Sequence, residues 1–361
     1  MLKARAAVRN LKEYHPPLGN RNGLRLDFNE NTSGCSPRVL EKLRSLDGEH
    51  LARYPEREPF EAVVAAHLGV GAVELLLTNG TDEAIHLICE TYLEPGDEVL
   101  IAVPTFAMYE IYAAATGATV ITVPAGEEFR FPTDAILSRI GKRTRLIALA
   151  NPNNPTGTLA PAPDLLRIAQ AAPQAALLVD EAYFEFCGET LLPQWRKLPN
   201  LFVSRTFSKA YGLAGLRIGV LMGNQEQMHM VRRASSPYNL NSIALACLPE
   251  ALADSEYVRR YAAEAGQGRD RLQSALGSRG IKYWPSRANF VLLHLGGACK
   301  PFIQAMRERG ILVRDRSGDP GCADCVRITL GTVEQNERLL TALGEVYEEI
   351  AVNSSMEQST P

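Results

Sequence analysis

The sequence predicts an α/β protein with a large domain built on a mostly parallel central sheet flanked by helices, and a smaller α/β domain. Three observations predict it. Between residues 98 and 203, short apolar runs alternate with amphipathic helical patterns, which is typical of parallel sheets. A second, shorter alternation follows a long helical stretch. The length of 361 residues, of which 46% are hydrophobic, suits one large domain and one smaller one.

Composition excludes several classes of function. The net charge is −3, and no basic cluster is interleaved with aromatic residues, which argues against nucleic acid as a partner. The longest apolar runs are too short to span a membrane. Residues 1–10 lack the apolar core of a signal peptide. Seven scattered cysteines, an odd number, suit free thiols in a reducing compartment, so we expect a cytoplasmic protein.

The N-terminal 38 residues show little helical pattern, and we expect this arm to join a later segment. Ser36-Pro37 predicts the start of a helix through Leu46, and a second helix is expected from Pro59 to about Leu68. The expected division is an arm that belongs to the small domain (1–38), a large domain (39–269), a small C-terminal domain (270–351) and a disordered polar tail (352–361).

A turn after the apolar run Leu75–Leu77 is the first candidate binding element. Gly80 leads into a helix whose N-terminus lies near Thr81. A helix N-terminus presents free N–H groups and suits phosphate. Asp82 and Glu83 must then point their charges away from it. Viewed alone, the turn also fits an ordinary capped helix.

The regular alternation follows. We expect strands at Glu98–Val103, Thr119–Val123, Leu146–Ala150, Ala175–Val179 and Leu201–Val203, with helices at Met108–Ala115 and Pro163–Ala171. From Met222 to Ala265 the pattern is helical, and a charged helix continues to Ser278.

Polar residues follow three of these strands. Asn154 comes after the third, Asp180 and Tyr183 after the fourth, and Lys209 after the fifth. Ligands of open α/β sheets bind outside the carboxyl ends of the strands. We therefore expect these side chains to share one crevice, although each taken singly fits an ordinary loop residue.

The stretch around Lys209 predicts a cofactor. Hydroxyls at Ser204, Thr206 and Ser208 cluster near this lysine, and Arg217 follows among glycines. A lysine amine forms a Schiff base with an aldehyde, and hydroxyls with an arginine hold a phosphate. An aldehyde that carries a phosphate is pyridoxal 5'-phosphate (PLP). Taken alone, the stretch also fits a polar loop with a solvated lysine.

The C-terminal part predicts the small domain. Its expected elements are Ile281–Trp284, Phe290–Leu295, the helix Pro301–Arg309, Ile311–Arg314, Cys325–Leu330 and a last helix from Val333. Cys322 and Cys325 have C-x-x-C spacing, but without a second pair or nearby histidines we expect no structural metal site. Loop thiols and a redox pair both remain open.

Three motifs in this order resemble the class I and II aminotransferases of the PLP fold-type I group. They are Asn-Pro-Asn-Asn-Pro-Thr-Gly at 151–157, Asp-Glu-Ala-Tyr at 180–183 and Ser-Lys-Ala-Tyr-Gly-Leu-Ala-Gly-Leu-Arg-Ile-Gly at 208–219. The resemblance runs from about Asn29 to Gly331. Within the group, the chain is most similar to the histidinol-phosphate aminotransferases, through residues 26–31, 53–55, 313–316 and 325–331. The family implies a homodimer with the active site at the subunit interface.

The resemblance implies roles around the cofactor ring. Lys209 would form the Schiff base, and Asp180 would pair with the pyridinium nitrogen. Tyr183 and Asn154 would hydrogen-bond the ring hydroxyl oxygen. Phe106, where a tyrosine is common in relatives, would stack on the ring.

It also implies roles for the anionic groups. The cofactor phosphate would be held by the Gly80 and Thr81 backbone, by Thr206 or Ser208, by Arg217, and by Tyr54 of the neighbouring subunit. Arg327, together with Asn154, would bind the amino-acid substrate through its carboxylate. Arg314 and Tyr14 would face the substrate's own phosphate. From the residues alone, a surface salt bridge for Arg327 and a structural pair with Asp315 for Arg314 remain alternatives.

The function implied by the resemblance is transamination between L-histidinol phosphate or imidazole-acetol phosphate and 2-oxoglutarate or glutamate, in histidine biosynthesis. An aromatic or broad-specificity aminotransferase and a phosphothreonine decarboxylase of the same fold are the alternatives. A PLP-binding regulator is disfavoured, because the motifs fill the chain from about residue 29 to 331. An ionised Asp180 favours the protonated ring, and the freed Lys209 amine can shuttle a proton, which typically contributes roughly 10²–10⁴-fold in rate.

Overall fold

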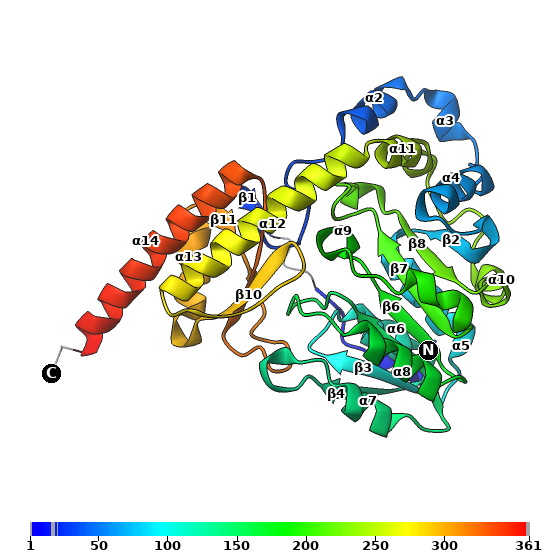
Figure 1. The fold of residues 1–361 in the computed structure, drawn as a ribbon, viewed down its shortest axis with the longest axis horizontal. Coiled ribbons are helices and arrows are strands. Elements are labelled where there is room, and N and C mark those ends of the chain that lie inside the picture. Colours follow the sequence, from blue (N-terminus) through cyan, green and yellow to red (C-terminus); the bar gives the residue numbers. More distant parts are fainter. Residues whose placement is uncertain (1, 16–18, 20, 359–361) are drawn as a thin grey trace.

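The computed structural model describes residues 2–15, 19 and 21–358, and has a large and a small unit joined by the long helix α12 (Ser255–Ser278) (Figure 1). The large unit contains a seven-stranded sheet in the order β2-β8-β7-β6-β5-β3-β4. Its strands are β2 (Leu75–Thr78), β3 (Glu98–Val103), β4 (Thr119–Pro124), β5 (Thr144–Ala150), β6 (Ala176–Asp180), β7 (Leu201–Thr206) and β8 (Gly219–Gly223).

The large sheet is mixed. Strands β7, β6, β5, β3 and β4 pair in parallel, as the sequence predicts, whereas β8 pairs antiparallel with both β7 and β2. The sequence-based assignment of Met222 to a helical stretch is wrong, because Met222 lies in β8 and the helix α10 begins only at Gln225. All five residues of β8 are buried. A short apolar run of this kind cannot be told from a buried helical segment by its periodicity.

Helices cover both faces of the sheet. They are α2 (Pro37–Ser45), α3 (Gly48–Ala52), α4 (Glu58–Leu68), α5 (Gly80–Tyr92), α6 (Met108–Thr116), α7 (Thr133–Arg139), α8 (Ala162–Ala171), α9 (Phe184–Cys187), α10 (Gln225–Ala234) and α11 (Ser242–Ala253). Successive residues of a strand face opposite sides. Accordingly Leu177 and Val179 belong to one hydrophobic cluster, and Leu178 between them belongs to the other.

Local signals explain the helix that the sequence predicted from Ser36. Ser36 is the N-cap of α2, and its hydroxyl accepts a hydrogen bond from the Arg38 backbone N–H at 3.2 Å. Pro37 occupies the first helical position, where its missing N–H has no consequence. The helix ends at Ser45, one residue before the predicted end.

The small unit holds an antiparallel sheet in the order β12-β13-β10-β9. Its strands are β9 (Lys282–Trp284), β10 (Phe290–His294), β12 (Arg314–Asp315) and β13 (Cys325–Thr329); α12, α13 (Cys299–Glu308) and α14 (Val333–Gln358) accompany them. The predicted strand Ile311–Arg314 is divided, because β11 (Ile311–Leu312) instead pairs in parallel with β1 (Leu24–Arg25).

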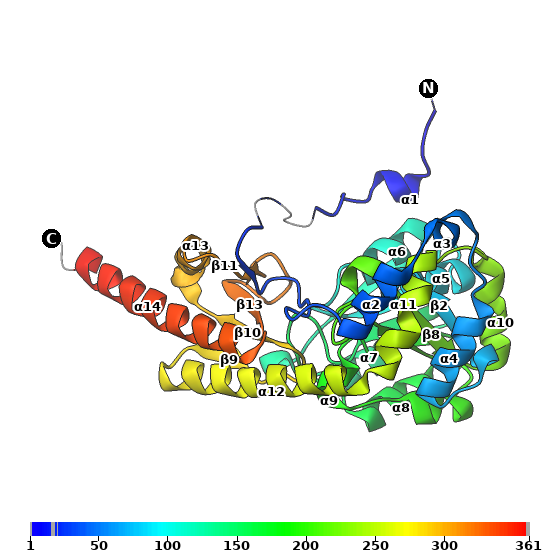
Figure 2. The ribbon, with the colours of Figure 1, turned by 90° about the horizontal axis from the view of Figure 1, so that it is seen from above.

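The N-terminal arm contacts both units. Leu26 belongs to the same hydrophobic cluster as Ile311 and Ile328, so this part of the arm joins the small unit as expected. The helix α1 (Ala6–Arg9) instead lies beside α6, and the Arg5 side chain donates to the Ala115 carbonyl at 2.9 Å (Figure 2). The expectation that the whole arm joins the small domain is therefore wrong for its first residues.

Two further points concern the expected division of the chain. The boundary proposed at residue 270 falls within α12, which continues from the large unit to the small one (Figure 1). The tail expected to be disordered from residue 352 is helical up to Gln358, because no glycine or proline interrupts the chain between Gly344 and Pro361. Residues 359–361 lie outside the described residues. The division itself stays a proposal.

None of the helices in residues 2–15 and 21–358 is long and apolar enough to cross a membrane.

Candidate active site

The predicted site residues meet in a cavity of about 640 Å³ at the carboxyl ends of the large-sheet strands, where the small unit faces them. Twelve of the fourteen line this cavity: Tyr14, Thr81, Phe106, Asn154, Asp180, Tyr183, Thr206, Ser208, Lys209, Arg217, Arg314 and Arg327. Gly80 and Tyr54 do not line it. The common crevice predicted from the strand ends is therefore present, with Asp180 as the last residue of β6 and Thr206 as the last residue of β7.

Lys209 projects into the cavity from the loop after β7. Its Nζ donates a hydrogen bond to the Phe28 carbonyl oxygen at 3.0 Å. Burial and, to a lesser extent, the positive charge of Arg327 lower the pKa of Lys209 to about 8. A neutral amine is the nucleophilic form, so this environment makes the lysine reactive near neutral pH.

Asp180 is buried and holds two hydroxyl donors. Tyr109 donates to Oδ2 at 2.8 Å, and Ser204 donates to Oδ1 at 2.9 Å. Burial raises the pKa of Asp180 to about 6, while both hydrogen bonds act in the opposite direction. A cation placed beside this carboxylate would favour its ionised form. Sequence reasoning missed Tyr109; its signal was a tyrosine on the buried face of a predicted helix, where the hydroxyl needs a partner.

Tyr183 is fixed by a residue of the arm. The Asn29 amide donates to the Tyr183 hydroxyl at 2.9 Å, and Thr329 donates to the Asn29 side-chain oxygen at 3.0 Å. Asn29 is buried with a φ of 55°, a left-handed conformation that asparagine tolerates. Burial raises the pKa of Tyr183. Asn29 stood in a predicted motif, but its role in holding Tyr183 appears only in three dimensions.

Arg327 lies on β13 with 5% of its surface exposed. Its guanidinium donates to the Asn154 side-chain oxygen and, at 2.7 Å, to the Asp27 carbonyl. Its Nε is buried and has no hydrogen-bond partner among the described residues. Burial lowers the pKa of Arg327 to about 10. The alternative of a surface salt bridge is thus wrong, because the side chain is buried and pairs with no carboxylate among the described residues.

The turn before α5 and Arg217 form a second positive end of the cavity. Gly80 has a φ of 74°, and a Cβ there would lie 2.6 Å from the Arg217 Nη2. Only glycine therefore lets this guanidinium approach the helix N-terminus. Arg217 forms an ion pair of 3.0 Å with Asp82, so the Asp82 charge points to the arginine. The Ser208 N–H donates to the Thr206 hydroxyl at 3.1 Å.

Arg314 and Tyr14 form the third polar group. Arg314 Nη2 lies 3.4 Å from the Tyr14 hydroxyl, and its guanidinium carbon lies 5.2 Å from the centre of the Phe28 ring. The Arg314 Nη1 is buried without a partner in the described part of the chain. No ion pair joins Arg314 to Asp315 in the described ranges. Sequence reasoning did not select Phe28, Arg316 or Asp319, which also line the cavity.

Tyr54 lies apart from this cavity. Its side chain is 78% exposed, and its ring packs against Tyr238 with 4.4 Å between ring centres. The assignment of Tyr54 to a neighbouring subunit's phosphate thus stays a prediction.

Cys322 and Cys325 are buried free thiols in a small hydrophobic cluster with Phe129, Trp284 and Leu292. The hydrogen bond to Cys325 and burial raise the pKa of Cys322 far above its ordinary value. Among the side chains that the structure describes, no three or more histidine, cysteine, aspartate or glutamate residues gather where they could hold a metal ion.

The fold and this site define a member of the aminotransferases. The model of the family "Aminotransferase class I and II" matches residues 21–343, and the chain belongs to that family. It is similar to a histidinol-phosphate aminotransferase of Geobacillus sp., with 37% identity over 94% of each chain, and to a histidinol-phosphate aminotransferase 2 of Methylococcus capsulatus, with 36% identity over 94% of this chain and 96% of the relative.

Comparison with solved structures gives the same fold. The crystal structure of a histidinol-phosphate aminotransferase from Sinorhizobium meliloti in complex with pyridoxal-5'-phosphate has a TM-score of 0.88 and 26% identity, and covers 97% of this chain and 99% of that one. An aspartate aminotransferase from Thermus thermophilus, with a TM-score of 0.80 and 22% identity, shares the fold.

The residues of this chain fit PLP. A cavity-lining lysine with a lowered pKa suits the aldehyde, and the buried Asp180 suits a ring nitrogen. The close approach of Gly80 and Arg217 leaves a positive cradle for a phosphate.

Proposed function

We propose that this chain is a PLP-dependent transaminase that exchanges an amino group between L-histidinol phosphate and 2-oxoglutarate, and in reverse between glutamate and imidazole-acetol phosphate, in histidine biosynthesis. The environment of Arg314 is the observation that supports a phosphorylated substrate. Its buried Nη1 has no partner among the described residues, and Tyr14 stands beside it. A buried charged donor without an acceptor is costly, and the substrate phosphate supplies an acceptor of opposite charge.

PLP supplies the electron sink for the reaction. Asp180, positioned by Tyr109 and Ser204, would hold the proton on the ring nitrogen. Tyr183 and Asn154 would bind the ring hydroxyl oxygen, and Phe106 would pack on the ring. Lys209 accepts the α-proton of the substrate and returns it to the product.

Two arginines bind different anionic groups of the substrates in this proposal. Arg327 holds the carboxylate of glutamate or 2-oxoglutarate in a planar, paired geometry that a lysine cannot provide. Arg314 and Tyr14 hold the phosphate of histidinol phosphate, which has no carboxylate. One cavity can thus serve both half-reactions.

The cofactor phosphate lies in this proposal against Gly80, Thr81, Thr206, Ser208 and Arg217. A phosphate bound there would replace Asp82 as the main partner of the Arg217 guanidinium, whose side chain is 44% exposed in the structure. A phosphate at the N-terminus of α5 is further stabilised by the helix dipole.

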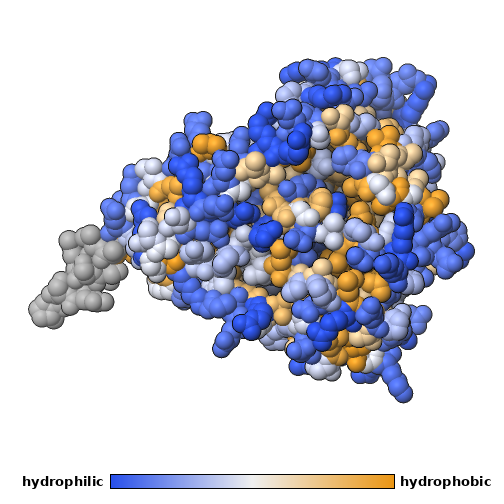
Figure 3. Space-filling view, viewed as in Figure 1, coloured by the Kyte–Doolittle hydropathy of each residue, from blue (hydrophilic) through white to orange (hydrophobic). Residues whose placement is uncertain are grey.

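The assembly in this proposal is a homodimer in which Tyr54 reaches the partner's cofactor phosphate. Large apolar side chains are exposed on the side of the large unit that α3, α4 and α10 form; they include Leu51, Val63, Val73, Met230, Tyr54 and Tyr238. Figure 3 shows apolar surface among the elements on the right of that view. Exposed apolar patches of this kind mark protein interfaces. The seven free thiols support a reducing, cytoplasmic location.

The proposal is tested by measuring amino transfer from glutamate to imidazole-acetol phosphate with the purified protein and with Lys209→Ala. The native protein should catalyse it and show the visible absorbance of lysine-bound PLP. The variant should lose both. Retention of transfer by the variant would refute the role of Lys209.

A further inference from the structure

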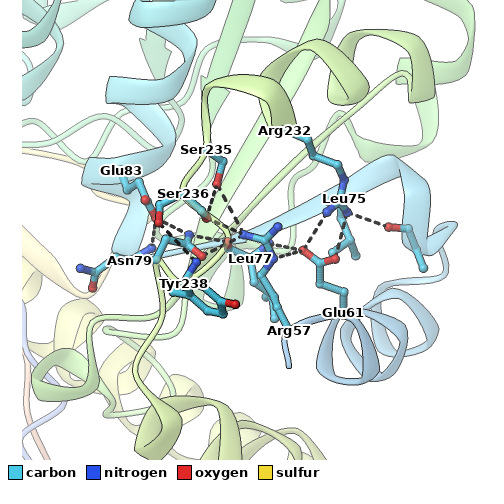
Figure 4. Close-up of polar contacts among 12 residues, drawn as sticks. Arg57, Glu61, Leu75, Leu77, Asn79, Glu83, Arg232, Ser235, Ser236 and Tyr238 are labelled. Atoms are coloured by element: carbon cyan, nitrogen blue, oxygen red, sulfur yellow. Dashed lines mark hydrogen bonds and ion pairs between the residues drawn. The ribbon is translucent and has the colours of Figure 1, made fainter. Parts of the chain in front are cut away.

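A polar network joins β2 and the turn that leads into α5 to α4, to α10 and to the loop after α10 (Figure 4). Arg57, 8% exposed at the start of α4, donates to the Asn239 side-chain oxygen at 2.9 Å. The Asn239 amide donates to the Glu83 Oε2 at 2.7 Å and to the Leu77 carbonyl at 3.0 Å. Asn239 therefore joins the loop after α10 to both sides of the turn.

A second part of the network fixes β2. Glu61 is 2% exposed and accepts from the Leu77 N–H at 3.1 Å and from Arg232 at 2.9 Å. Arg57 forms an ion pair with the same carboxylate at 3.2 Å. Both backbone groups of Leu77 are thus held by side chains of this network, three residues before the phosphate turn.

Glu83 connects this network to the proposed phosphate site. Glu83 lies in the first turn of α5, where a carboxylate is attracted to the helix N-terminus. That N-terminus is also where the cofactor phosphate is proposed to bind, and two negative groups there repel. In the structure the Glu83 carboxylate accepts hydrogen bonds from the N–H of Asn79, the N-cap residue, at 2.5 Å and from the Asn239 amide at 2.7 Å, and not from the N–H groups of Gly80 or Thr81.

The network also extends toward the exposed pair of tyrosines, Tyr54 and Tyr238. Arg57 donates to the Ser236 carbonyl at 3.4 Å, and Ser236 lies two residues before Tyr238, which packs against Tyr54. The same contacts therefore support the phosphate turn and the tyrosine pair beside it.

We propose that Asn239, anchored by Arg57, is a positioning residue for the cofactor phosphate: it holds the Glu83 carboxylate beside Asn79 and so keeps it from the N–H groups of Gly80 and Thr81. This inference rests on the proposed PLP-dependent function. It assigns a task to residues that neither line the cavity nor touch the substrate.

The test compares two ligands that differ only in the phosphate. Apoprotein of the native chain and of Asn239→Ala is titrated with PLP and with pyridoxal, which has the aldehyde and ring but no phosphate. We expect the dissociation constant for PLP to rise about tenfold or more in the variant, because a freed carboxylate opposes the phosphate. The constant for pyridoxal should change less than about twofold. Equal changes for both ligands, or no change for either, would overturn the proposal.

Two further variants separate this role from a general loss of structure. Asn200→Ala is a matched control, because the Asn200 amide also donates to backbone carbonyls, of Ala169, Ala172 and Ala175, at 2.9 to 3.1 Å. It should leave the ratio of the two constants unchanged. Adding Glu83→Gln to Asn239→Ala removes the competing charge and should restore most of the PLP affinity; no recovery would contradict the role of Glu83.

The outcome also distinguishes this proposal from the function on which it rests. If the native chain binds no PLP and shows no Lys209-dependent absorbance, the proposed function fails. If the native chain binds PLP and Asn239→Ala keeps the native ratio, only the positioning role fails.

Discussion

The Tyr109 hydroxyl lies 2.8 Å from the Asp180 Oδ2 and donates a hydrogen bond to it. Tyr109 is 1% exposed and comes from α6, whereas Asp180 ends β6. Burial alone raises the pKa of Asp180, and this hydrogen bond lowers it again. The ionisation of Asp180 therefore depends on Tyr109, a residue outside the predicted motifs. Only the ionised carboxylate attracts a pyridinium, so Tyr109 also affects this interaction.

Tyr109→Phe should weaken PLP binding near neutral pH. The variant loses a donor to the ionised carboxylate, so the pKa of Asp180 in the apoprotein should rise above about 6. A protonated Asp180 attracts the pyridinium less. PLP affinity of the native apoprotein should therefore fall as the pH drops through about 6, and in Tyr109→Phe the same fall should occur at higher pH. Spectroscopic titrations from pH 5 to 8 measure both; superimposable profiles would contradict this role.

The rate of cofactor uptake should depend on the ionisation of Lys209. Burial lowers the pKa of Lys209 to about 8, and only the neutral amine attacks an aldehyde. The rate constant for pyridoxal binding to apoprotein should rise with pH and level off above about 8. Stopped-flow absorbance measures it. A rise that continues to the ordinary lysine pKa of about 10.4 would show a solvated amine instead.

Gly80→Ala should impair phosphate binding more than folding. A Cβ at this position would meet the Arg217 guanidinium at 2.6 Å, and the left-handed φ of 74° is unfavourable for alanine. The backbone strain costs roughly 1–2 kcal/mol. Arg217 must also move, so PLP affinity should fall in addition.

Gly69→Ala is the control for this strain. Gly69 has a φ of 70°, and a Cβ there meets nothing within 4 Å. Both variants should lose a similar free energy of unfolding in denaturant titrations. Only Gly80→Ala should bind PLP more weakly than native protein; equal PLP affinities would contradict the assigned cradle.

Arg314→Ala should lose activity on the phosphorylated substrate. A hydrogen bond to a charged group contributes about 1.5–3 kcal/mol, so kcat/KM for histidinol phosphate should fall about 10- to 150-fold. The exposed Arg271, paired with Glu337, offers Arg271→Ala as a control that keeps the native value. Steady-state kinetics with histidinol phosphate measure kcat/KM for both variants. An unchanged kcat/KM in Arg314→Ala would remove the reason for a phosphorylated substrate.

Much of the fold and site follows from local sequence. The strands predicted to end at Ala150, Val179 and Val203 are regular apolar runs, and the polar residues after them indicate one crevice. Strand β8 was missed because a short apolar run cannot be told from a buried helical segment by its periodicity. Its antiparallel pairing with β2 and β7 is likewise reported by no local pattern. Asn29 and Tyr109 were not selected because their partners lie 154 and 71 residues away.

The most direct test of the account is a pair of half-reactions followed by absorbance. The PLP form of the protein is mixed separately with L-histidinol phosphate and with L-phenylalanine. Rapid conversion to the pyridoxamine form with histidinol phosphate, and none on the same time scale with phenylalanine, is the predicted result. Comparable conversion by phenylalanine would contradict the proposed specificity and leave Arg314 without its anion.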